Sequence, residues 1–128
     1  MGSPAVDIKD LLVADSSFTF AENTFVGIIP EETVPSIGVL DSPGQPPEGI
    51  SDIDYPSVQI TILGEPFKYT ETYALADTVK NLLHQQGGQT INGTWYLGIW
   101  ADNDPIFLGL DEKNRPEFSI NFRIQRSP

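Results

Sequence analysis

The 128-residue chain contains no cysteine, a single histidine and only seven basic residues. Without cysteine, disulfide bonds, thiolate metal sites and a cysteine nucleophile are excluded. No apolar run approaches the roughly 18 residues that a membrane-spanning helix requires. The N-terminus also lacks the basic, apolar and small-residue order of a secretory signal. We therefore expect neither a membrane span nor a signal peptide.

The scarcity of basic residues gives the chain a formal net charge of −11, and the charge is unevenly placed. Residues 1–56 hold ten acids and one base, whereas residues 113–128 hold four bases and one acid. Proteins that grip nucleic acid through its phosphates cluster Lys and Arg, so this balance argues against such a protein. The acidic charge is compatible with a protein that has no role with nucleic acid. It is equally compatible with a protein whose surface lets DNA pass without binding it.

The length and the apolar fraction of 39% suit one folded domain over residues 1–128. A short helix is predicted at Pro4–Asp15, with Ser3 as its N-cap. A longer helix is predicted from about Thr70 to Gln86, ended by Gly87-Gly88. The apolar positions that should face a sheet are Leu75, Val79 and Leu82.

Alternation of apolar and polar residues predicts several strands. In the strand Pro116–Gln125, alternate residues divide into an apolar face that should enter the core and a polar face. The apolar face consists of Phe118, Ile120, Phe122 and Ile124, and the polar face of Ser119, Asn121, Arg123 and Gln125. The other strand candidates are Phe25–Ile29, Ile37–Leu40, Val58–Leu63, a short segment near Gln89–Ile91, and Trp95–Trp100.

Two segments are interpreted as irregular. Asp104–Asp111 is predicted to be a turn-rich link between two strands. Residues 41–55, rich in Pro, Gly and acids, are predicted to form a long loop. A loop of this length is either functional or a surface excursion without a role, and the sequence supports both interpretations.

No segment carries a catalytic signature. The chain has no Gly-x-Ser-x-Gly elbow, dinucleotide fingerprint or phosphate loop. His84 falls on the polar face of its helix, where a solvated side chain is expected. The acids around Asp102-Asn103-Asp104 suggest calcium only superficially, because their spacing does not match an EF-hand. We expect no metal, no cofactor and no enzymatic activity.

An ordered set of segments carries a family resemblance. It comprises the strand ending at Pro30, Ile37–Leu40 running into a Pro/Gly loop, Tyr55–Ile60, the helix with Tyr73, Ala76 and Leu82, Asn92-Gly93, Pro105 with Leu108-Gly109 and Asp111, and Asn114-Arg115 before Phe118–Phe122. This order resembles the minor capsid or tail-terminator proteins of long-tailed bacteriophages.

The resemblance implies an α/β (α+β) fold, with a mixed, mostly antiparallel sheet, a long helix on one face and a short N-terminal helix. It implies a virion protein without enzymatic activity, assembled in the host cytoplasm. Copies would form a ring, by analogy a hexamer, that caps the head-proximal end of the tail tube and ends its polymerisation. The implied partners are the major tail tube protein and a head-completion or connector protein, with DNA passing through the lumen. The alternatives are another neck or head-completion protein of the same virion, or a small binding module or enzyme with an unrecognised site.

Charge placement predicts which residues face these partners. The basic C-terminal stretch should meet acidic neighbours or a partner ring, and the N-terminal acids should face the lumen or the tube, away from DNA phosphates. The candidate interface residues are Arg115, Asn121, Arg123 and Arg126. The candidate lumen-facing or tube-facing acids are Glu31, Glu32, Asp41, Glu48, Asp52 and Asp54.

Overall fold

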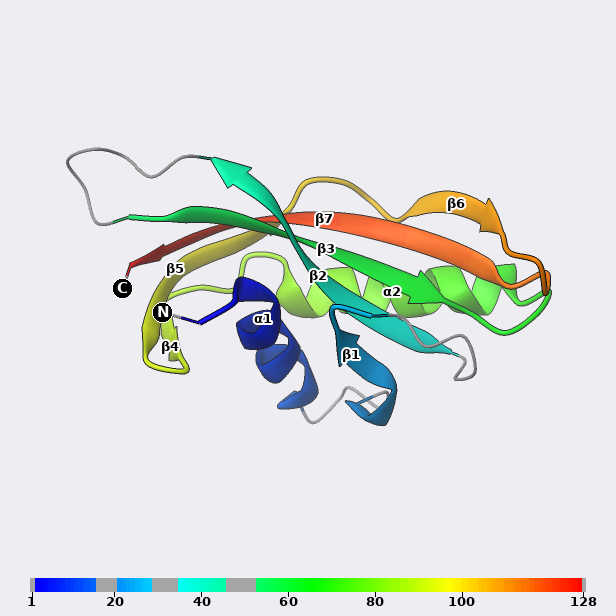
Figure 1. Cartoon of the computed structure of the whole chain (residues 1–128), viewed down its shortest axis with the longest axis horizontal. Helices are drawn as coiled ribbons and strands as arrows, with labels where there is room; N and C mark the ends of the chain where they lie inside the picture. The colour runs from blue at the N-terminus through cyan, green and yellow to red at the C-terminus, as the bar shows by residue number, and fades with distance from the viewer. Residues whose placement is uncertain (1, 16–20, 29–34, 46–52, 128) are drawn as a thin grey trace.

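A computed structural model describes residues 2–15, 21–28, 35–45 and 53–127, and Figure 1 shows their arrangement. In chain order the elements are α1 (Pro4–Val13), a 3-10 turn η1 (Ala21–Asn23), β1 (Thr24–Val26), β2 (Ser36–Gln45), β3 (Tyr55–Leu63), α2 (Tyr69–Leu83), β4 (Gln89–Ile91), β5 (Thr94–Ala101), β6 (Ile106–Leu110) and β7 (Pro116–Ser127).

The described strands form one sheet in the order β1-β2-β3-β7-β5-β4. β1 pairs with β2 in parallel, and every other pair of neighbouring strands among the described residues is antiparallel. β7 is 12 residues long and lies beside β3 on one side. On its other side it pairs first with β6 and then with β5. The prediction of a mixed, mostly antiparallel sheet is confirmed.

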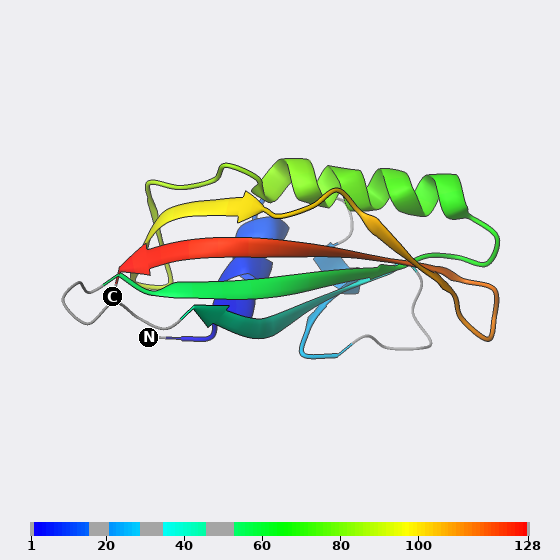
Figure 2. The same ribbon diagram turned by 90° about the horizontal axis from the view of Figure 1, so that it is seen from above.

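The core lies between one face of this sheet and both helices. The four alternating apolar residues of β7, from Phe118 to Ile124, are at most 1% exposed, as the sequence predicts. They form one cluster with buried side chains of β2, β3, α1 and α2. α2 runs roughly along the strands, whereas α1 crosses them steeply (Figure 2). The opposite sheet face is not covered by either helix, and it carries the polar side chains of β7.

α2 is 15 residues long, so the long helix of the prediction is not confirmed. It ends at Leu83, before Gly87-Gly88, because the next residues leave the helix to pair with β5. Gln85 has a φ of +65° and donates its N–H to the carbonyl of Ile99. Leu75 and Val79 are buried as predicted, but Leu82 is half-buried. Ala76 and Leu83 complete the buried stripe in its place.

α1 receives its N-terminal cap from a distant strand. Ser3 occupies the N-cap position, but its hydroxyl donates a hydrogen bond to Asp41 of β2. The same carboxylate accepts the N–H of Ala5 at 2.9 Å. An acid at the N-terminus of a helix also suits the helix dipole. The cap thus comes from Asp41, and α1 buries Ala5, Ile8 and Leu12 against the sheet.

Two segments predicted to be irregular are strands. Asp41–Gln45, expected to begin the long loop, continues β2 and pairs with β3 across a bulge. Ile106–Leu110, expected to be a link, forms β6 along β7. In both segments the partner strand supplies the hydrogen bonds that local periodicity does not indicate.

Candidate functional site

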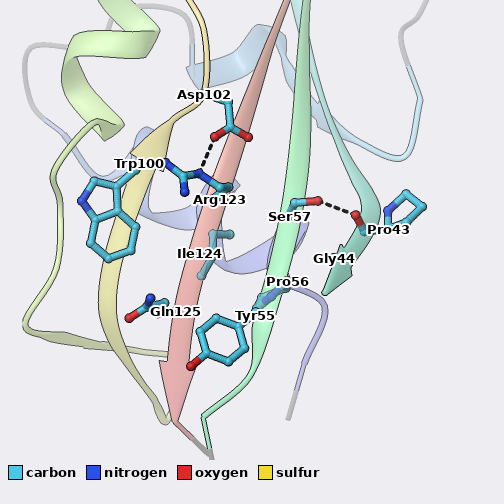
Figure 3. A pocket seen from close by; sticks show the side chains of 10 residues that line it. All are labelled: Pro43, Gly44, Tyr55, Pro56, Ser57, Trp100, Asp102, Arg123, Ile124 and Gln125. Atoms are coloured by element: carbon cyan, nitrogen blue, oxygen red, sulfur yellow. Dashed lines mark hydrogen bonds and ion pairs between the residues drawn. The ribbon is translucent and has the colours of Figure 1, made fainter. Parts of the chain in front are cut away.

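The open face of the sheet carries a cavity of about 360 Å³ where β2, β3, β5 and β7 come together (Figure 3). Tyr55 and Trp100 supply its aromatic walls. Arg123, on β7, is 66% exposed in its side chain and forms an ion pair with Asp102 beyond the end of β5. The Ser57 hydroxyl donates to the Pro43 carbonyl at 2.9 Å and holds the ends of β2 and β3 together. The cavity therefore combines aromatic surface with one accessible guanidinium.

The turn at Asp102-Asn103-Asp104 is fixed to its surroundings by side-chain bonds. The N–H of Asn121 donates to the Asn103 side-chain oxygen at 3.1 Å. Asp104 accepts a hydrogen bond from Lys80 of α2, which raises the pKa of Lys80 and lowers the pKa of Asp104. With Asp102 paired to Arg123, both carboxylates of the turn are neutralised by cations of the same chain. In the described ranges, no group of three or more Asp, Glu, His or Cys is arranged to hold a metal ion.

Arg126, a predicted interface residue, is only 5% exposed and lies at the centre of a polar network. Its guanidinium pairs with Asp54 at 3.2 Å and lies 3.7 Å from Asp7 of α1. It also donates to the carbonyl of Gly2 at 3.0 Å and to the Tyr96 hydroxyl at 3.3 Å. The network joins α1, β5 and β7, and it leaves Arg126 little surface for another protein.

Tyr96 is the aromatic member of this network and is fully buried. Its hydroxyl donates to Asp7, whose carboxylate also accepts a bond from Asn92 at 2.7 Å. Burial, together with the hydrogen bond to Asp7, raises the pKa of Tyr96 well above its ordinary value near 10. The phenol is therefore held neutral while the nearby charges of Asp7 and Arg126 offset each other.

Arg115, another predicted interface residue, is 6% exposed. Its guanidinium contacts Asp111 at 2.6 Å and closes the turn between β6 and β7. Burial pushes the pKa of Asp111 upward, but hydrogen bonds from Arg115 and Lys113 outweigh that effect and hold it below its ordinary value. Of the four predicted interface residues, Arg123 and Asn121 thus lie on the open face. Arg115 and Arg126 are buried: Arg115 closes the turn between β6 and β7, and Arg126 contacts Asp7 of α1.

The predicted acids divide in a similar way. Asp41 caps α1 while remaining exposed, and Asp54 pairs with Arg126. Both carboxylates therefore have partners within the chain, which the charge pattern did not indicate. The remaining four, Glu31, Glu32, Glu48 and Asp52, lie outside the described residues.

His84, expected to be solvated, is half-buried at the end of α2. Its Nδ1 accepts the backbone N–H of Ala101 at 3.0 Å. The bond ties the C-terminus of α2 to the end of β5. The histidine thus has a structural contact that its helical position alone did not reveal.

A second surface, which the sequence did not indicate, lies at the end of the sheet away from Gly2 and Arg126. Four β6 side chains are about half exposed: Ile106 at 45%, Phe107 at 43%, Leu108 at 52% and Leu110 at 54%. The inner edge of this surface is anchored, because Phe107 packs edge-on against Tyr69 of α2 with ring centroids 5.1 Å apart. None of the residues from Pro105 to Leu110 is charged.

The molecule is an α+β domain with one open sheet face and an uncharged, partly exposed strand, β6, at the sheet edge. No helix in the described ranges is long and apolar enough to cross a membrane. The chain belongs to the bacteriophage tail terminator family, whose model, described as bacteriophage tail terminator protein, matches residues 6–128. The resemblance predicted from the sequence is thereby confirmed, and with it a structural phage tail protein.

The fold is also similar to that of a chain in a solved structure titled "Virion of native gene transfer agent (GTA) particle". The TM-score is 0.76, and the match covers 99% of this chain and 96% of that chain. The two sequences are 12% identical, so this likeness concerns the fold. No curated protein matches the chain.

Proposed function

We propose that the protein assembles into a ring that caps the head-proximal end of a phage tail tube, ends tube polymerisation and offers a surface for joining the head. The observation that carries this proposal is the family match over residues 6–128. Family analogy suggests a hexamer that works in the virion after assembly in the host cytoplasm. Its partners would be copies of itself, the major tail tube protein and a head-completion or connector protein.

The electrostatics of the described residues support a passive route for DNA. Five of the seven basic residues form ion pairs within the chain: Lys9, Lys80, Arg115, Arg123 and Arg126. Cations already paired with carboxylates contribute little to binding phosphates. In this proposal, DNA moves through the lumen without specific binding. Some of the acids Glu31, Glu32, Asp41, Glu48, Asp52 and Asp54 are proposed to face the lumen or the tube.

Arg123 and Asn121 are proposed as the docking residues of the open sheet face, because the cavity offers aromatic surface and the Arg123 side chain stays 66% exposed although it is paired with Asp102. Arg115 and Arg126 would support this face from within, through Asp111 and Asp54. A charge pair at the rim of an interface contributes only about 0–1 kcal/mol. Its main effect is to orient the partners and to suppress wrong docking.

The test is a tube polymerisation assay with the purified major tail tube protein. Adding the wild-type protein should shorten the tubes and leave a ring at one end in electron micrographs. Arg123→Glu should give longer, uncapped tubes while melting at nearly the wild-type temperature. Lys113→Glu is the matched control, because it makes the same charge change at another exposed C-terminal residue. Tubes of unaltered length with the wild-type protein would contradict the proposed function.

A further inference from the structure

The cavity on the open sheet face has an aromatic wall on each side of β7. The register of β3 with β7 places Tyr55 opposite Gln125. On the other side of β7, Gly98 of β5 pairs with Gln125. The indole of Trp100 lies over Gly98, where a Cβ atom would fall 2.2 Å from the ring. The two aromatic rings therefore stand on either side of Gln125 (Figure 3), over strand positions about 10 Å apart.

We call this part of the cavity the aromatic trough. Its members are Tyr55 and Trp100 as walls, with Gln125 and Arg123 along its floor. Gln125 and Arg123 lie two residues apart on one face of β7, because Ile124 between them is 1% exposed and enters the core. The trough therefore follows the direction of β7, and its shape suits one extended chain.

The floor of the trough offers hydrogen-bond donors. The Arg123 guanidinium pairs with Asp102 through Nε, and its side chain is still 66% exposed, so its terminal N–H groups are available. In the part of the chain that the structure describes, the Gln125 side-chain amide has no hydrogen-bond partner. Asp102 is the only acid among the described lining residues, and Arg123 already occupies it. A ligand in the trough would thus meet donors rather than free carboxylates.

The backbone of the trough cannot hold a ligand in place of these side chains. β7 is paired with β3 on one side and with β5 on the other over the length of the trough. An added strand needs an unpaired edge, so a segment lying on this face must be recognised through side chains. A phosphate ligand is disfavoured, because the chain has a net charge of −11 and Arg123 is already paired.

A proline-rich segment has the complementary chemistry. Proline has no backbone N–H, so such a segment presents carbonyl acceptors without backbone donors. It also adopts the extended polyproline II helix without internal hydrogen bonds, and aromatic grooves recognise it by packing against its rings. Two residues of that helix rise about 6 Å, and two residues of a strand rise about 7 Å. Successive acceptors can therefore meet Gln125 and Arg123 in turn.

We propose that the aromatic trough binds a proline-rich segment of a partner protein in the polyproline II conformation. A proline ring of the partner packs between Tyr55 and Trp100, and its carbonyls accept hydrogen bonds from Gln125 and Arg123. Pro43 and Pro56 also line the cavity, and their fixed φ angles limit the movement of its rim. This inference rests on the proposed function for its expectation that the partner is another virion protein.

The first test is a calorimetric titration of the whole protein with a polyproline peptide. A Gly/Ser peptide of equal length is the control, because it is flexible and has no proline rings. We expect saturable binding of polyproline that is at least about tenfold tighter than binding of the control peptide. Equal binding of both peptides, or no binding of polyproline at millimolar concentration, would overturn the proposal.

The aromatic wall is tested with Trp100→Leu, which keeps an apolar side chain but removes the flat ring. We expect polyproline binding to weaken at least about tenfold. The matched control is Trp95→Leu, because Trp95 is 46% exposed on the same strand and does not line the cavity. Its affinity should stay close to wild type. Equal affinities in the two variants, with thermal unfolding confirming that both are folded, would exclude the trough as the binding site.

The donors are tested with Gln125→Glu, which replaces the amide donor by a carboxylate that only accepts. Polyproline has no backbone N–H to offer that carboxylate, so binding should weaken at least about tenfold. Gln85→Glu makes the same charge change at an exposed residue after α2 and should bind normally. A neutral maltose oligosaccharide serves as the competing probe, because its hydroxyls both donate and accept. Tighter binding of the oligosaccharide than of polyproline would assign the trough to sugars and overturn the proposal.

Tube polymerisation distinguishes this inference from the proposed function. Normal capping by a protein that binds no polyproline would overturn the inference and leave the function standing. Polyproline binding that depends on Trp100 and Gln125, in a protein that does not limit tube length, would overturn the function and leave the ligand class standing.

Discussion

Gly98 and Trp100 of β5 are in direct contact on the open sheet face, and the indole lies over the glycine. A Cβ atom on residue 98 would fall 2.2 Å from Cη2 of the Trp100 ring. The ring can keep its place only because residue 98 has no side chain. Since Trp100 lines the cavity beside Arg123, Gly98 sets the shape of the candidate docking surface.

Gly98→Ala should therefore displace the indole, at a cost of about 1–3 kcal/mol for overpacking. The measurement is the fluorescence emission of Trp100 in a Trp95→Phe background, combined with thermal unfolding. We expect a shifted emission maximum and a lower Tm. Gly2→Ala is the control, because a Cβ there would meet nothing within 4 Å. An unchanged emission spectrum in Gly98→Ala would show that the contact does not constrain the ring.

Phe122 tests the assignment of the β7 faces. Its side chain is fully buried, so Phe122→Ala should lower the free energy of unfolding by about 3–5 kcal/mol. Asn121→Ala, the adjacent change on the opposite face, should alter it by less than about 0.5 kcal/mol. Chemical denaturation of both variants gives the comparison. Equal stabilities would contradict the division of β7 into a core face and a polar face.

Asp41 tests the cap that a strand supplies to α1. Asp41→Ala removes the acceptor for the N–H of Ala5 and should cost about 0.5–2 kcal/mol. Asp41→Asn keeps an oxygen in that position and should recover most of the loss. Hydrogen exchange of the first-turn amides of α1 should accelerate in the alanine variant alone. Equal exchange in both variants would show that the charge, rather than the hydrogen bond, supports the helix.

Tyr96 should make stability depend on pH at the alkaline limit. Because the fold raises its pKa, this group's contribution is fully present below pH 10 and is lost as the pH rises through the folded value. Tyr96→Phe should lose about 1–3 kcal/mol at neutral pH, since Asp7 and Arg126 each lose a partner. It should also show a shallower alkaline decline in unfolding free energy.

The control for that series is Tyr73→Phe, which removes a hydroxyl from a side chain that is 38% exposed. Its unfolding free energy should stay close to wild type at neutral pH. A Tyr96→Phe profile that declines as steeply as the wild type above pH 10 would assign the alkaline transition to other groups.

Local patterns in the sequence were sufficient for much of the fold. The alternation in β7 predicted its buried face, and the spacing of Leu75 and Val79 predicted the buried side of α2. The same reasoning missed β6, because its apolar residues follow one another instead of alternating. A strand of that kind is recognisable only when β7 is known to lie beside it.

The site residues were harder to predict because their partners are remote. Arg126 is buried by Asp54 and Asp7, which lie 72 and 119 positions earlier in the chain. Charge counting placed Arg126 on the surface, since a net positive segment reveals nothing about distant acids. The composition of residues 41–55 likewise indicates a loop at Asp41, although its carboxylate caps α1. In each case, contacts between residues far apart in the chain determine whether the side chain is buried or bound.

The placement of β7 has a consequence for how the protein is made. β7 is the last described strand to be translated, yet it separates β3 from β5 and β6 in the sheet. While the ribosome is still adding the preceding strands, their shared neighbour does not exist. Formation of the sheet must wait for contacts between distant parts of the chain, which generally slows folding. Completion of the sheet must therefore follow synthesis of the C-terminal residues that form β7.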